Sequence, residues 1–404
     1  MKKKSASQSG FFNLRVLIGV FMVLAGVFLA FLGSGAFSAT AASIIQAMQK
    51  GKIITSSTDP LVPVGFDCST IHEKGIDKQE NFRAGAIMIA CGQVPGASTS
   101  ATSTLGLVGR FFQKLLTPLA YGATDVDLVT GAETSPNVTQ SETYTLANPD
   151  NPLQIVTAYN DSRGRNASPI NISGASVSTD GGTTFTRLTL GSGQGPFSNT
   201  LGDPVVLYNR PTGTWFTVWL DGGCGGQGIG GYKSTTPENP ASWTHFTCVY
   251  SEGSADRESG WSDNNPSSPY YGRMYVSWND FAVGSGALVV SYSSDNGATW
   301  HAPITVSNLS TFIRDVQITG DLSGNGVVYI AGMDDGGGGF PHNNINHLYK
   351  STDGGASWTN TYTSPTSFPG PGVTANGYFA CMFSDGAGYW RHEGWGEPAA
   401  YNNV

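Results

Sequence analysis

Charged side chains are scarce in this sequence: Asp, Glu, Lys and Arg together make up 12% of its 404 residues. Acidic residues outnumber basic ones by 29 to 21, which gives a formal net charge of −8. Proteins that bind nucleic acid need a basic surface to neutralise phosphates, so this balance excludes that class of partner. A glycine-rich loop with the pattern of a phosphate-binding site is also lacking.

Long apolar segments are equally scarce. One apolar run, Val16–Leu32, spans 17 residues, which is at the low edge of the length needed to cross a bilayer. Three lysines at positions 2–4 precede it, and the small residues Ala36 and Ser38 follow it. This order is typical of a signal peptide, so we expect residues 1–38 to be cleaved and the protein to be secreted or held in the cell envelope, without membrane contact. An uncleaved anchor is the alternative.

Glycine and aromatic residues are, by contrast, abundant. The chain contains 54 Gly, 16 Tyr and 9 Trp, a composition typical of a turn-rich all-β protein. The pattern S-x-D-x-G-x-x-aromatic occurs in VSTDGGTTF (177–185), YSSDNGATW (292–300) and KSTDGGASW (350–358). Strand-favouring residues precede each copy, which predicts three β-hairpins closed by these turns.

Each residue type of this pattern has a structural role in a hairpin turn. The Asp side chain can accept hydrogen bonds from backbone N–H groups, the Gly permits a positive φ, and the aromatic ring can fold over the turn. The residues to which we assign this role are Ser178, Asp180, Gly182, Phe185, Ser293, Asp295, Gly297, Trp300, Ser351, Asp353, Gly355 and Trp358.

The spacing of the turns predicts the architecture. Ser178, Ser293 and Ser351 lie 115 and 58 residues apart, so a further unit is expected near the middle of the longer interval. YKSTTPENPASWTHF lies there and keeps the serine, Ser234, and the aromatic end, which makes the intervals 56, 59 and 58. Such a period predicts a β-propeller of four-stranded blades. We expect four repeats and a partial fifth in residues 122–404, as a C-terminally truncated form of a six-bladed propeller.

The turn that recurs once per blade resembles the Asp-box, or bacterial neuraminidase repeat, of the sialidase superfamily. The resemblance covers residues 122–404. It implies a propeller and a retaining glycosidase with a tyrosine nucleophile, a Glu that assists it and an Asp acid/base. It also implies three arginines that clamp the substrate carboxylate, since the planar guanidinium binds a carboxylate through two hydrogen bonds.

Residues 39–121 differ in character from the repeats. Ile71–Gln93 shows no strand alternation and predicts one or two short helices that end at Cys91. Cys68 and Cys91 are expected to form a disulfide in an oxidising compartment, and a Ser/Thr/Gly-rich linker follows them. We interpret this segment as a spacer. A second disulfide is expected between Cys224 and Cys248, because both positions fall at one face of their blade.

Acidic residues recur at corresponding places in the repeats. The second strand of each blade ends in an acid, and these acids should gather at the face opposite the motif turns: Asp161, Asp221, Asp280, and Asp334 with Asp335. The first strands should open on the same face with Glu142, Asp203, Asp256-Arg257-Glu258 and Arg314-Asp315. Such a face could bind a sugar, although an Asp at a strand end often only caps a turn.

The resemblance assigns provisional roles to several of these residues. Asp161 in the loop AYNDSRGR is the candidate acid/base and Glu258 the candidate assistant of the nucleophile. The expected substrate contacts are Arg163, Arg257, Arg314, Asp221, Asp280 and Asp335. The aromatic-Arg-Ile-Pro motif of the family is absent, and no tyrosine is assigned as nucleophile, Tyr389 being the nearest candidate.

The sequence therefore predicts a secreted, monomeric propeller directed at a glycan, with an exo-sialidase-like glycoside hydrolase as the leading hypothesis. A non-catalytic propeller that binds glycan or protein at the cell surface is the alternative, and a purely structural extracellular domain is a third. We expect no cofactor and no metal. DDGGGG and SDNNPSS could hold Ca²⁺ through oxygen ligands, but ordinary turn chemistry explains both.

Overall fold

The computed structural model describes residues 53–79, 81–93, 140–189, 195–334, 343–369 and 398–402. The expected signal peptide, the linker, most of the partial fifth repeat, Asp335 and Tyr389 lie outside these residues. Ile53–Val404 forms one compact unit. Within the described ranges, no helix has the length and apolar character needed to span a membrane.

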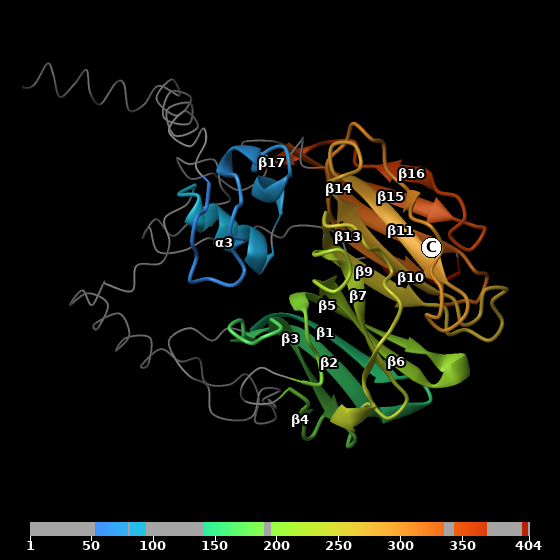
Figure 1. Ribbon diagram of the computed structural model, residues 1–404. Coiled ribbons are helices and arrows are strands. Elements are labelled where there is room, and N and C mark those ends of the chain that lie inside the picture. The colour runs from blue at the N-terminus through green and yellow to red at the C-terminus, as the bar shows by residue number, and fades with distance from the viewer. Residues whose placement is uncertain are drawn as a thin grey trace, which may run out of the picture. The chain divides into compact units, whose positions relative to one another are not determined.

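The described chain is an all-β propeller whose repeats each contribute four antiparallel strands (Figure 1). The strands of the first two repeats are β1 (Gln140–Asn148), β2 (Asn151–Gly164), β3 (Asn171–Ser178), β4 (Thr186–Arg187), β5 (Thr200–Asn209), β6 (Thr214–Asp221), β7 (Gly228–Ser234) and β8 (Thr244–His245). Those of the next two are β9 (Ala255–Ser262), β10 (Met274–Asp280), β11 (Ala287–Ser293), β12 (Ile304–Thr305), β13 (Ile313–Gly320), β14 (Val328–Asp334), β15 (Asn343–Ser351) and β16 (Thr359–Thr363), and β17 (Phe368–Pro369) pairs with β15.

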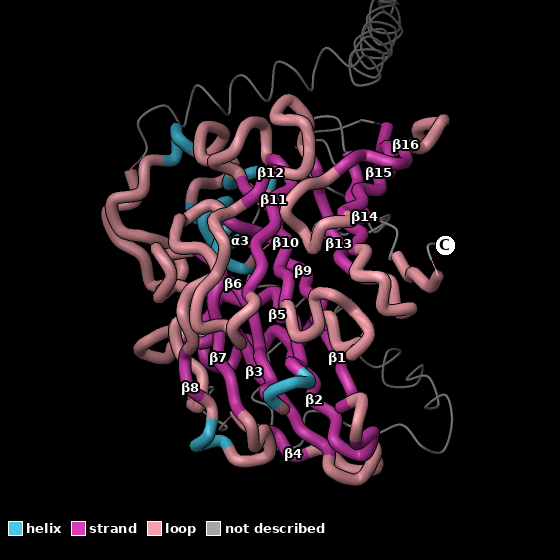
Figure 2. Tube along the Cα trace, turned by 90° about the vertical axis from the view of Figure 1, so that its right-hand side faces the viewer, coloured by secondary structure: helices cyan, strands magenta, loops and turns pink. Residues whose placement is uncertain are grey.

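The second strands of the second and third blades are buried on both faces. Every residue of β6 (TWFTVWLD) and of β10 (MYVSWND) is buried, which explains why these segments read as apolar runs without alternation. Neighbouring blades supply the cover: Phe216 of β6 and Met274 of β10 belong to one continuous core. The first strands β5, β9 and β13 lie next to one another, as Figure 2 shows, so the blades succeed each other around their first strands.

The motif turns form the predicted hydrogen bonds. In the third repeat the Ser293 hydroxyl donates to Asp295 Oδ1 at 2.9 Å, the Gly297 N–H donates to Ser293 Oγ at 2.9 Å, and the Thr299 N–H donates to Asp295 Oδ1 at 2.9 Å. The turns at Ser178 and Ser351 repeat these bonds. The motif glycine has a φ of +71° at Gly297, in the left-handed region that a side chain would disfavour.

The N-terminal segment contains the short helices η1 (Cys68–Thr70), η2 (Ile76–Lys78) and α3 (Phe82–Ala90), and η3 (Arg210–Thr212) and η4 (Pro240–Ser242) lie within the blades. The Asn81 side chain caps α3 by accepting the Ala84 N–H at 2.9 Å. The predicted helices and the Cys68–Cys91 disulfide are confirmed, as is the disulfide between Cys224 and Cys248.

The interpretation of this segment as a spacer is wrong for its described part. Ile71 and Ile87 are buried in the same apolar cluster as Ile172 and Leu201 of the blades. Asn81 Nδ2 also donates to the buried Asp256 of β9 at 2.9 Å. Because apolar and polar contacts both bind it to the blades, the segment packs on the propeller as an integral part of its core.

Asp180 provides a pH test of the motif turns. Hydrogen bonds from the Thr184 hydroxyl and N–H lower the pKa of Asp180 from 3.8 to about 2. A lowered folded-state pKa gives a stabilisation that is complete above the unfolded-state pKa and is lost as the pH falls through the folded-state value. In denaturant titrations, the stability difference between wild type and Asp180→Asn should therefore be constant above about pH 5 and shrink between about pH 4 and 2. A difference independent of pH would contradict the role of this carboxylate.

Candidate active site

The aspartates expected at the ends of the second strands accept hydrogen bonds from nearby backbone N–H groups. Asp221 and Asp280 are the last residues of β6 and β10, whereas β2 continues past Asp161 to Gly164. In each case the N–H two residues further on donates to Oδ1: Arg163 to Asp161 at 3.1 Å, Gly223 to Asp221 at 2.7 Å, and Ala282 to Asp280 at 2.9 Å. These aspartates are 1%, 0% and 0% exposed, respectively. Their burial and hydrogen bonds match the alternative that these aspartates only cap turns. They do not support substrate binding by Asp221 and Asp280.

Asp161 lies in a buried ion-pair network. Arg163 donates to both of its carboxylate oxygens, and Arg187 Nη2 donates to Oδ2 at 2.7 Å. Burial alone would raise the pKa of Asp161, but the hydrogen bonds from Arg163 and the charge of Arg187 outweigh it, and the pKa is lowered. A general acid must be protonated at the working pH. Asp161 is held as a carboxylate, so the predicted acid/base role is not supported at this position.

Two of the expected substrate arginines are also engaged inside the protein. The Arg163 side chain is 5% exposed and bound to Asp161. Arg314 is 2% exposed, and its guanidinium lies over the Phe312 ring at 5.3 Å from the ring centroid. The guanidinium group of neither arginine is accessible to a ligand. The third, Arg257, is exposed to a cavity and lies 3.6 Å from Glu142.

This open cavity, which we call the axial cavity, lies between the first strands of the four described blades. It has a volume of about 700 Å³ and is lined by β1, β5, β9 and β13, with Glu142, Asp203, Arg257 and Glu258 as its charged residues. Its residues come from the strand starts that recur in the sequence. The expectation that the first strands open on one common site thus agrees with the geometry.

An irregularity at the start of each first strand shapes the cavity wall. The pairing register shifts at 141–144, 202–205, 256–259 and 314–317, as at a β-bulge. Glu142, Asp203 and Arg257 occupy the shifted positions with φ of +52°, +57° and +53°. Left-handed backbone costs a non-glycine residue roughly 1–2 kcal/mol, so the surrounding contacts must hold it in place.

Asn160 supplies one such contact. It is fully buried on β2, its Oδ1 accepts the Asp203 N–H at 2.7 Å, and its Nδ2 donates to Glu142. Asn160 therefore connects the charged bulges of two blades. The Asn that precedes the Asp in both AYND and SWND was a visible signal for this role, although only the Asp was predicted to belong to the site.

Glu258 is the most perturbed acid of the cavity. It is 8% exposed, and neither carboxylate oxygen has a hydrogen-bond partner among the described residues. Burial raises its pKa well above the usual 4.5, and the negative charges of Asp203, Asp256 and Glu142 add to this effect. A carboxyl in such surroundings retains its proton to higher pH.

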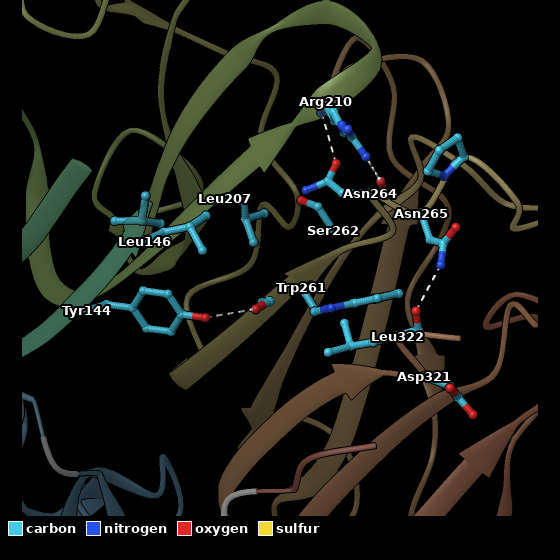
Figure 3. Close-up of a pocket in the computed structure, with 13 residues that line it drawn as sticks. Tyr144, Leu146, Leu207, Arg210, Trp261, Ser262, Asn264, Asn265, Asp321 and Leu322 are labelled. Carbon is cyan, nitrogen blue, oxygen red and sulfur yellow. Dashed lines mark hydrogen bonds between the residues drawn. The ribbon is translucent and has the colours of Figure 1, made fainter. Parts of the chain in front are cut away.

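Figure 3 shows a second cavity, which has a volume of about 470 Å³. Tyr144 and Trp261 line both this cavity and the axial cavity. The Tyr144 hydroxyl donates to the Gly260 carbonyl at 3.4 Å, and Leu322 lies beside the Trp261 ring in Figure 3. The wall shared by the two cavities is therefore aromatic, a surface on which a sugar ring can pack. The sequence analysis assigned neither residue.

Comparison with known proteins gives no family assignment: no protein family and no curated protein matches the chain. Among solved structures, the catalytic domain of a Coprinopsis cinerea GH62 α-L-arabinofuranosidase aligns over 58% of this chain and 72% of that chain, with 15% identity and a TM-score of 0.39. An α-L-arabinofuranosidase from Fusarium graminearum aligns over 57% and 69%, with 14% identity and a TM-score of 0.40.

An exo-β-1,3-galactanase from Phanerochaete chrysosporium aligns over 54% of this chain and 48% of that chain, with 14% identity and a TM-score of 0.37. The chain thus spans about half the length of the galactanase. Identities and TM-scores this low assign neither an activity nor a substrate to it.

Removal of the Asp161 carboxylate should destabilise the fold. Asp161→Ala would leave Arg163 and Arg187 buried without their acceptor, and breaking a buried ion pair typically costs about 3–5 kcal/mol. Urea denaturation should show this loss. Asp150→Ala is the matched control, because its ion pair with Arg210 is largely exposed and should matter far less. Equal effects of the two substitutions would contradict a special role for the buried network.

Glu258 should make stability depend on pH. Because its folded-state pKa is raised above 4.5, ionisation is harder in the folded than in the unfolded protein, and stability is lost as the pH rises from the unfolded-state through the folded-state pKa. Glu258→Gln should therefore be more stable than wild type at pH 8, with a gap that closes toward about pH 4. The exposed Glu238→Gln should show no such trend, and a trend of equal size there would contradict the prediction.

Proposed function

We propose that this protein is a glycoside hydrolase that binds a neutral sugar in the axial cavity and uses Glu258 as its proton donor. The observation that carries this proposal is the state of Glu258: a buried carboxyl without a hydrogen-bond partner on the wall of a cavity, with a pKa well above its usual value. Hydrolysis of a glycosidic bond requires such a protonated acid beside the leaving oxygen.

The reaction also needs a second, ionised carboxylate. Asp203 suits this role because it lines the same cavity, and its charge is the largest electrostatic contribution to the raised pKa of Glu258. In a glycosidase, one of two neighbouring acids donates a proton and the other acts as the ionised partner. Glu258 would protonate the leaving oxygen, and Asp203 would assist the attack on the anomeric carbon or stabilise the charge that develops there.

Glu142 and Arg257 would position these two groups. Their side chains lie 3.6 Å apart, and Asn160 holds Glu142 in place from β2. The positive charge of Arg257 offsets the negative charge of one of the three carboxylates of the cavity. Its N–H groups can donate hydrogen bonds to sugar hydroxyls. Tyr144 and Trp261 provide the aromatic wall.

The charge of the cavity favours a neutral sugar over a sialic acid. Glu142, Asp203 and Glu258 face it with a single arginine, Arg257. A carboxylate substrate would meet like charges and only one guanidinium, since Arg163 and Arg314 are buried elsewhere. Exo-sialidase activity, which the resemblance of the motif turns implies, is therefore the weaker candidate. Export by the signal peptide and action as a monomer belong to the same proposal.

The test is hydrolysis of a panel of aryl glycosides by the 404-residue chain. Neutral substrates, including α-L-arabinofuranosides and β-galactosides, should be cleaved in preference to an aryl α-sialoside. Glu258→Gln should lower the rate about 10²–10⁴-fold for a substrate with a poor leaving group. The loss should be much smaller for dinitrophenyl glycosides, because dinitrophenolate departs without protonation. Glu238→Gln is the matched control and should retain full activity.

The leaving-group comparison separates the alternatives. An equal loss on both kinds of leaving group would show that Glu258 is not the proton donor. Cleavage of the sialoside alone would replace the neutral sugar with the sialidase alternative. Binding of neutral glycans that depends on Trp261, without turnover of any substrate, would establish the non-catalytic binding propeller instead.

A further inference from the structure

A cluster of potential metal ligands lies outside the axial cavity, in the second repeat. Two pairs with the same spacing form it: Asp221 with Cys224 in DGGC, and His245 with Cys248 in HFTC. Pairs of ligands separated by two residues, joined by a longer intervening segment, are typical of structural zinc sites.

The fold brings these two pairs together. Asp221 ends β6 and His245 ends β8, which lie on either side of β7 in one sheet. Asp221 Oδ2 and His245 Nε2 are 2.7 Å apart, and the potential ligand atoms of Asp221, Cys224 and His245 all lie within 4.8 Å of one another. Cys248 is joined directly to Cys224. One carboxylate, one imidazole and the Cys224 sulfur are thus gathered around one point, and the Cys248 sulfur is bonded to that of Cys224.

The disulfide masks this ligand set. In the structure the sulfurs of Cys224 and Cys248 are bonded to each other, and a metal requires thiolates. Only the oxygen of Asp221 and the nitrogen of His245 are then suitable donors.

We propose that reduction of the Cys224–Cys248 disulfide converts this cluster into a four-ligand Zn²⁺ site formed by Asp221, Cys224, His245 and Cys248. A phosphine reductant breaks the sulfur–sulfur bond, is itself oxidised to the phosphine oxide with the oxygen of water, and leaves two thiols. Each thiol loses its proton when the metal binds. The thiolates and imidazole favour Zn²⁺ over Ca²⁺ or Mg²⁺, which take oxygen ligands.

Several features suit the site to a metal. Asp221 is 0% and Cys224 1% exposed, so bulk water has little access to the ligands. The His245 side chain is 39% exposed, which leaves a path by which an ion can enter. The N–H of Gly223 holds Asp221 Oδ1 at 2.7 Å, and a hydrogen bond of this kind orients a ligating carboxylate.

Bound metal would also replace the disulfide as the crosslink of this loop. Gln227 in the same loop donates to Gln79 of the N-terminal segment at 2.9 Å and to the Ala255 carbonyl at 3.0 Å. Either crosslink therefore holds the loop against which the N-terminal segment packs. This inference is independent of the chemistry proposed for the axial cavity.

Cobalt titration of the full chain tests the proposal. After reduction with a phosphine and removal of the reductant, wild type should bind one Co²⁺ per chain with a thiolate-to-cobalt charge-transfer band and tetrahedral d–d bands, and Zn²⁺ should displace it. The oxidised protein should show neither band. The Cys224→Ser/Cys248→Ser variant, which retains Cys68 and Cys91, should also lack them.

The histidine variants distinguish a built site from adventitious thiol binding. Loss of a group that only orients a ligand already weakens metal binding about 10–100-fold, so His245→Gln should lose at least that much affinity. His301→Gln, a change at an exposed histidine, is the matched control. Equal Co²⁺ affinity of His245→Gln and wild type, or equal binding by the oxidised protein, would overturn the proposal.

Stability gives a second readout. If reduction lowers the melting temperature, stoichiometric Zn²⁺ should raise it again in wild type and not in the double-serine variant, because binding to the folded state stabilises it. A reduced wild type that Zn²⁺ does not stabilise would contradict the proposed site.

Discussion

The burial of the second strands on both faces, which is complete in β6 and β10, is the constraint on which the rest of the structure depends. Trp219 and Trp278, at the centres of β6 and β10, are 0% exposed, and neither blade could cover such surfaces alone. The blades must therefore stack side by side. Stacking in turn brings the starts of their first strands together and creates the axial cavity.

The same constraint explains what the charged residues do. Where a strand leaves the core, the backbone N–H groups that follow need acceptors. Asp221 and Asp280 provide them at the ends of β6 and β10, and Asp161 does so within β2. Their burial removes them from any substrate. The charged residues that line the cavity lie instead on the first strands, where the irregular pairing places Asp203 and Arg257 at the cavity wall.

Neighbouring charges give two buried acids opposite pKa shifts. Asp161 and Glu258 are both buried acids, yet two arginines lower the pKa of the first, whereas burial and neighbouring carboxylates raise that of the second. The first is suited to holding the fold together and the second to donating a proton. The difference arises from their neighbours, because burial alone would raise both.

The local pattern by itself determined the hairpin turns, the period of the repeats, the register of the acids and both described disulfides. Turn chemistry and strand periodicity are properties of neighbouring residues, so the sequence displays them directly. Only the tertiary structure decided that Asp161 pairs with Arg187, that the N-terminal segment packs on the blades, and that Tyr144 and Trp261 line the cavity beside the acids. Those contacts join residues from different strands or blades, and the burial and charge that set each pKa come from the packing of the whole propeller.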